Sequence, residues 1–196
     1  MDGGPTARLL IDEVMPRYDF REVHDCFVPA EPERAYAAAK TVPAAEIRLL
    51  GPLMAIRSLP ATIARRRALR PSGRPVPVLD QFLRAGFVLL GERPGSELVA
   101  GAVGKFWSLS GNQPLEAVRT REDFVGFSDP GYAKAVFNLA VSPEGSGSRV
   151  TTETRIAGTD PTATKIFRRY WIVIRLPSGA IRRSWLNAIR RRAEAA

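Results

Sequence analysis

The alternation of apolar and polar residues is clearest late in the chain, where residues 150–156 read Val-Thr-Thr-Glu-Thr-Arg-Ile. A period of two is typical of a β-strand. The even-numbered positions hold both apolar residues and are expected to face inward. Thr151, Glu153 and Arg155 are then expected to face outward.

A helical pattern follows this strand and continues almost to residue 196. Thr159 or Asp160 can cap its first turn, and Pro161 suits a position where no N–H is needed. Phe167, Trp171 and Ile174, among others, mark one apolar face. The Pro-Ser-Gly step at 177–179 predicts a kink or a split. A strand that leads into a long helix predicts a curved sheet closed by that helix, with an internal cavity for small apolar ligands.

The rest of the chain also alternates between strand and helix patterns. A helix is expected after Pro32, a broken helical region at 44–69 with Pro52 and Pro60 inside it, and a short helix at 121–127. We expect a leader over residues 1–20 and one domain over 21–196, with a helical insert at about 44–70. Strands are predicted at 21–28, 86–91, 97–107, 134–141 and 149–157.

Composition narrows the functional classes. The 196 residues are 45% hydrophobic and carry a net charge of +9, from 29 Lys and Arg against 20 Asp and Glu. With one His and one Cys, an intrachain disulfide is impossible and a zinc site is close to excluded, so we expect no metal and no cofactor. No signal peptide is recognised, and the longest apolar runs fall short of the roughly 18 residues of a membrane span. A cytoplasmic protein is the expectation.

Residues 26–36, Cys-Phe-Val-Pro-Ala-Glu-Pro-Glu-Arg-Ala-Tyr, resemble the start of the START/Bet v 1-like (SRPBCC) superfamily, where a strand meets Ala-Pro-x-Glu-x-Val-Trp. Tyr36 stands in the aromatic place, and Glu31 interrupts the Ala-Pro order. Residues 151–155 and 168–171 look like a bacterial subgroup of unassigned function. The resemblance implies an α+β helix-grip fold: a curved antiparallel sheet wrapped around a long C-terminal helix, with an internal cavity. Members bind lipids, sterols or polyketides, and some are cyclases or dehydratases.

A cavity for small molecules is mostly apolar with a few placed polar groups. Aromatic and hydroxyl or amide side chains of the predicted strands and last helix supply both kinds. Asn138 is also compatible with solvent exposure, because its parity is opposite to that of Phe137, and helix aromatics such as Trp171 can be plain core. The candidate ligand-binding residues are Phe106, Trp107, Tyr132, Phe137, Asn138, Thr152, Thr154, Tyr170 and Trp171.

No catalytic signature is present. His24 and Cys26 share a strand face whereas Asp25 points away, so a Cys–His pair is geometrically feasible, but a structural role is favoured. An outward Glu153 is more simply a cross-strand partner than an acid or base. Residues 101–105, Gly-Ala-Val-Gly-Lys, lack the spacing of a phosphate-binding loop, and glycine there is expected to ease sheet curvature.

Arginine clusters form the last candidate. Residues 160–196 hold nine Lys and Arg against two Asp and Glu, a net +7. Such a segment suits an anionic membrane surface, whereas no nucleic-acid motif accompanies it. Three hypotheses result: a binder of a small hydrophobic, lipid-like or polyketide-like molecule; an enzyme of the polyketide cyclase or dehydratase type; and a peripheral anionic-membrane or lipid-transfer protein. The oligomeric state is left open.

Overall fold

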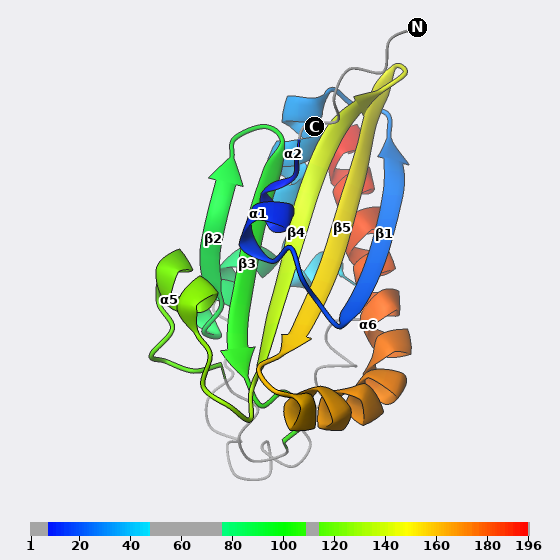
Figure 1. Ribbon diagram of the computed structural model, residues 1–196. Coiled ribbons are helices and arrows are strands. Elements are labelled where there is room, and N and C mark those ends of the chain that lie inside the picture. The colour runs from blue at the N-terminus through cyan, green and yellow to red at the C-terminus, as the bar shows by residue number, and fades with distance from the viewer. Residues whose placement is uncertain (1–7, 48–75, 109–113, 196) are drawn as a thin grey trace, which may run out of the picture.

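A five-stranded antiparallel sheet forms the centre of the protein, in a computed structural model that describes residues 8–47, 76–108 and 114–195. The strand order is β1-β5-β4-β3-β2, so the first strand pairs with the last. A long C-terminal helix, α6, packs on one face, which gives the predicted α+β helix-grip fold (Figure 1). The strands are β1 Phe20–Val28, β2 Val88–Arg93, β3 Glu97–Gly104, β4 Ala133–Glu144 and β5 Gly147–Gly158.

The helices cover both faces of this sheet. The face that carries Phe137 and Leu139, here called the inner face, packs against α6 Pro161–Ala195, α2 Pro32–Thr41 and α4 Val78–Arg84. The face that carries Val136 and Asn138, the outer face, is covered by α1 Leu10–Val14 and α5 Arg121–Gly126 (Figure 1). A short 3-10 turn, η1 Ala44–Glu46, follows α2. The remainder of the predicted insert, 48–70, lies outside the described residues.

The last helix begins as its sequence predicts. The Asp160 carboxylate accepts hydrogen bonds from the amides of Thr162 and Ala163, and Pro161 is the first helical residue. The helix remains helical through Pro177 but bends, so its first half crosses one end of the sheet and its second half runs along the inner face (Figure 1). The bend follows from the missing N–H and the bulk of the proline ring.

Gly101 confirms the strand interpretation of residues 101–104. It lies within β3, and a Cβ atom there would stand 2.7 Å from Leu90 Cδ1 and 3.0 Å from Phe124 Cε2. Leu90 and Phe124 are both buried in the outer-face core. Glycine at this position therefore leaves room for the side chains of Leu90 and Phe124 to pack against β3 on the outer face.

A buried polar network fixes α1 to the outer face. Glu97 Oε2 accepts from the Leu10 amide at 2.6 Å, and Glu97 Oε1 accepts from Asn138 Nδ2 at 2.8 Å. Arg155 donates to Glu153 Oε1 at 2.6 Å and to the Met15 carbonyl at 2.8 Å. The negative charge of the Glu97 carboxylate is also stabilised by the positive N-terminal end of α1.

Glu153 and Arg155 face outward as predicted, but they are covered and only 3% and 5% exposed. Of the two alternatives for Asn138, solvent exposure is wrong, since the residue is fully buried. Burial alone would raise the pKa of Glu153, but hydrogen bonds from Arg21 and Arg155 outweigh it and hold the pKa below its ordinary value. The segment before β1 provides the cover that the alternation in β5 could not reveal.

Candidate functional site

Polar side chains meet on the inner face where β1 and β5 pass under α6. Glu22 and His24 are two apart on β1 and so share a face, and their partners across the sheet are Thr154 and Thr152. Arg182 of α6 donates to Thr152 Oγ1 at 3.1 Å. Glu22, His24, Thr152 and Arg182 are called the inner polar cluster below.

Glu22 and His24 form a close pair with spare hydrogen-bonding capacity. His24 Nε2 lies 3.1 Å from Glu22 Oε1, and the two side chains are only 13% and 10% exposed. The two groups are near enough for an ion pair when the imidazole is protonated, but they are not aligned as a hydrogen bond. Among the described residues, Glu22 Oε2, His24 Nε2 and Trp185 Nε1 are buried atoms without a hydrogen-bond partner. Native proteins seldom leave such atoms unmatched unless water or a ligand meets them.

Arg182 brings a positive charge among aromatic rings. Its guanidinium carbon lies 4.6 Å from the centre of the Phe137 ring and 5.5 Å from that of Trp185. Burial lowers the pKa of Arg182 to about 10, although the nearby negative charge of Glu22 opposes the change. The group therefore stays charged at neutral pH, and among the described residues it forms no ion pair. A partly buried cation of this kind is suited to an anion or a carbonyl oxygen.

Gly179 lets α6 approach this cluster. The residue is buried one turn before Arg182, and a Cβ atom there would stand 2.7 Å from Glu22 Oε1 and 3.2 Å from His24 Nε2. Any side chain at this position would push against the pair. The close approach of the helix keeps Glu22 and His24 shielded from solvent on this side.

A groove of about 610 Å³ runs between β1 and the bend of α6 and reaches the inner polar cluster. Glu22, His24 and Gly179 line it together with Trp171 and arginine side chains of both elements. The groove is open to solvent, so it provides a route to the pair from outside. The enclosed cavity predicted from the sequence stays a prediction.

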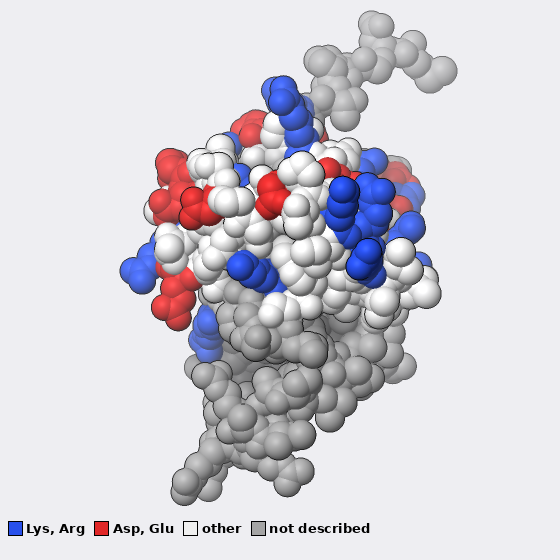
Figure 2. Space-filling view, turned by 60° about the horizontal axis from the view of Figure 1, so that its bottom comes forward, with Lys and Arg blue, Asp and Glu red and all other residues white. Residues whose placement is uncertain are grey.

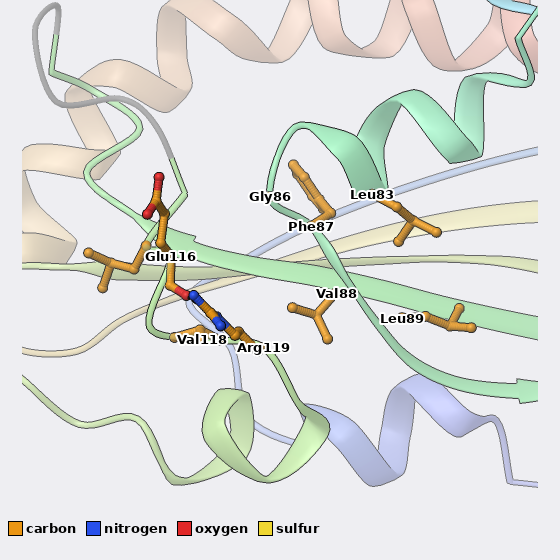
Figure 3. Close-up of a pocket in the computed structure, with 9 residues that line it drawn as sticks. Leu83, Gly86, Phe87, Val88, Leu89, Glu116, Val118 and Arg119 are labelled. Carbon is orange, nitrogen blue, oxygen red and sulfur yellow. The ribbon is translucent and has the colours of Figure 1, made fainter.

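A second cleft, of about 520 Å³, lies at the β2 edge of the sheet (Figure 3). Leu83, Gly86 and Phe87 line one side of it, and Glu116 and Arg119 come from the segment before α5. It is also open to solvent. The described residues that line it include no cluster of buried polar atoms, so the groove beside β1 is the stronger candidate.

The predicted ligand-binding residues fall into three places. Phe106, Trp107, Tyr170 and Trp171 gather around Phe167 at the first half of α6, where the ring centres of Trp107 and Tyr170 lie 6.2 and 5.5 Å from that of Phe167. Phe137, Thr152 and Thr154 lie on the inner face by the polar cluster. Tyr132 and Asn138 lie on the outer face, away from both groups.

Sequence reasoning missed Glu22, Arg182, Gly179 and Trp185. Glu22 and His24 occupy alternate positions of one strand, so the sequence indicates that they share a face, as it does for His24 and Cys26. Arg182 follows Glu22 by 160 residues and is one of many arginines in α6. Only the packing of α6 on β1 identifies which arginine is enclosed.

Cys26 lies on the same inner face but is not suited to nucleophilic attack. Its thiol donates to the Leu186 carbonyl at 3.7 Å, and burial raises its pKa to about 11. A thiol that remains protonated at neutral pH is a poor nucleophile. The structural interpretation of Cys26 is the better one.

No group of three or more His, Cys, Asp or Glu side chains among the described residues could hold a metal ion. None of the described helices combines the length and the apolar character that a bilayer crossing requires.

Comparisons with known proteins give only distant likenesses. No family model matches the chain, and no curated protein matches it. Among solved structures, TTHA0849 from Thermus thermophilus is 14% identical over 90% of this chain and 98% of its own, with a TM-score of 0.34. CV1439 from Chromobacterium violaceum is 10% identical (90% and 99% covered, TM-score 0.34), and Ara h 8.0201 is 9% identical (90% and 99%, TM-score 0.29). Values this low decide neither family nor function, and the helix-grip assignment rests on the sheet and helix themselves.

Proposed function

We propose that the protein binds a small hydrophobic molecule on the inner face of its sheet, with a polar or anionic end at the inner polar cluster. The observation that carries this proposal is the set of buried, unmatched atoms, Glu22 Oε2, His24 Nε2 and Trp185 Nε1, beside the charged Arg182. Aromatic rings around them, including Phe137, suit an apolar body. The groove between β1 and α6 is the route of entry.

Arg182 is expected to select for a negative charge. Anilinonaphthalene sulfonate, an apolar anion, should bind the full chain more tightly than the uncharged N-phenylnaphthylamine. In Arg182→Met the affinity for the anion should fall about tenfold or more, because a hydrogen bond to a charged group is lost, while the uncharged dye binds as before. Fluorescence titration measures both affinities.

Two controls sharpen this experiment. Arg190→Met removes an exposed arginine from the same helix and should leave both affinities unchanged. Because the pKa of Arg182 is about 10, anion affinity of the unmodified protein should fall as the pH rises through that value, and this fall should vanish in Arg182→Met. Equal affinities for the two dyes, or an equal effect of both substitutions, would show that the cluster does not hold the polar end.

The 3.1 Å contact of Glu22 and His24 favours a second function, an enzyme of the cyclase or dehydratase type. A carboxylate beside an imidazole, both largely shielded from solvent, can remove a proton and return it. Nitrobenzisoxazole, whose ring opens when a base takes its carbon-bound proton, is a suitable absorbance probe. Ring opening above the buffer rate should drop about a hundredfold in Glu22→Gln and persist in Asp25→Asn, on the opposite face of β1. If both variants open the ring at the same rate as buffer alone, the enzyme hypothesis is wrong and the binding function remains.

A further inference from the structure

An apolar ridge is exposed at the bend of α6. Ile172, Val173 and Leu176 are 72%, 73% and 80% exposed, well above the other exposed large hydrophobic side chains of the described residues. All three lie within two turns before Pro177. Single exposed apolar residues are ordinary, but several adjacent ones on one ridge mark a contact surface.

Cations surround this ridge. Lys165, Arg168, Arg169 and Arg175 are exposed, and none of them forms an ion pair with another described residue. From residue 161 to residue 193 the helix carries no acidic side chain. Some arginines elsewhere, such as Arg149 and Arg155, do pair with carboxylates. The first half of α6 therefore combines an apolar ridge with unmatched positive charge, the pattern of a helix that lies on an anionic lipid surface.

The shape of the molecule presents this segment outward. The bend at Pro177 places the first half of α6 across one end of the sheet, at a corner of the fold (Figure 1). In Figure 2, which brings that end forward, Lys and Arg side chains gather on the side where α6 bends in Figure 1, beside an uncharged protrusion. Ile172, Arg175 and Leu176 also line the groove that leads to Glu22 and His24. A flat surface that met the ridge would therefore lie at the mouth of that groove.

We propose that residues 165–176 of α6 dock the protein on an anionic lipid bilayer. Ile172, Val173 and Leu176 enter the boundary between headgroups and acyl chains, and the surrounding Lys and Arg side chains contact the negative headgroups. The docking is peripheral, because no described helix is suited to cross the bilayer. It needs no ligand in the groove and so stands apart from the proposed function.

Vesicle flotation of the full chain tests this proposal. Binding is expected to vesicles of phosphatidylcholine with about one-third phosphatidylglycerol, to weaken as salt screens the charges, and to be absent on phosphatidylcholine alone. Ile172→Ser/Leu176→Ser should lower the affinity about tenfold or more. Arg168→Gln/Arg169→Gln should remove the preference for anionic lipid. All four positions are exposed, so circular dichroism is expected to show an unchanged fold.

Matched substitutions away from the ridge serve as controls. Val125→Ser, at a position 49% exposed on α5, and Arg119→Gln, in the segment before α5, should bind vesicles like the unmodified protein. Equal binding to neutral and anionic vesicles, or undiminished binding by the ridge variant, would overturn the proposal. A dimer in light scattering that Ile172→Ser/Leu176→Ser dissociates, without vesicle binding, would overturn it too, because the ridge would then join two copies of the chain.

Discussion

Arg155→Met is expected to lower the free energy of unfolding by about 3–5 kcal/mol. The Arg155 side chain, 6% exposed, holds the Glu153 side chain, 4% exposed, and reaches Asp12 and the Met15 carbonyl of the segment that covers the outer face. Methionine fills similar volume but leaves buried acceptors without a donor. Urea denaturation of the full chain measures the change.

Arg149→Met is the matched control for this prediction. Arg149 lies on the same strand and pairs with Glu144 and Asp25, but these groups are 36–50% exposed and water replaces a lost partner. The urea midpoint of unfolding of Arg149→Met should hardly change. The double variant Arg155→Met/Glu153→Leu should recover much of the loss, since removing both buried charges is far less costly than removing one. Equal losses for Arg149 and Arg155 would show that burial of the network does not matter.

Glu97→Ala should release α1 from the outer face. The Glu97 carboxylate, 2% exposed, accepts hydrogen bonds from the Leu10 and Ile11 amides and from Asn138. The substitution leaves these donors buried and unmatched, with an expected loss of about 3 kcal/mol or more. Trypsin should also cleave after the exposed Arg17 much faster than in the unmodified protein, because α1 no longer holds that segment.

Glu116→Ala, an exposed carboxylate outside this network, should change neither stability nor cleavage. Glu97→Gln keeps an acceptor oxygen, so its stability and its rate of cleavage should lie between those of Glu97→Ala and Glu116→Ala. If Glu97→Ala loses the expected stability but is still cleaved slowly at Arg17, the apolar contacts of Ile11 and Val14 are sufficient to hold α1.

The sheet and the last helix could be predicted from the sequence because their signals are local. Alternation in β5, the Asp160-Pro161 start and the Pro177 bend each depend on residues a few positions apart. The parity of Thr152 and Thr154 was also correct, since register follows from one apolar face. These signals were sufficient to predict the fold class without any knowledge of the ligand.

The site was only partly predictable, because its contacts are distant in sequence. Asn138 and Glu153 look like surface residues until α1, more than 120 positions earlier, is seen to cover them. Arg182 resembles its exposed neighbours until Gly179 brings the helix onto Glu22 and His24. Side chains that alternate in a strand show which residues share a face, but not what lies opposite them.

The two faces of the sheet pack against different helices and so have separate apolar cores. Ile11, Val99 and Phe124, with their neighbours, form an apolar core on the outer face that does not involve α6. This core stabilises β2, β3 and β4 from the side opposite α6. Substitutions of Phe137 and Arg182, on the inner face, leave this outer-face core in place. We therefore expect directed evolution to tolerate changes at the proposed binding residues better than in a sheet with a single core.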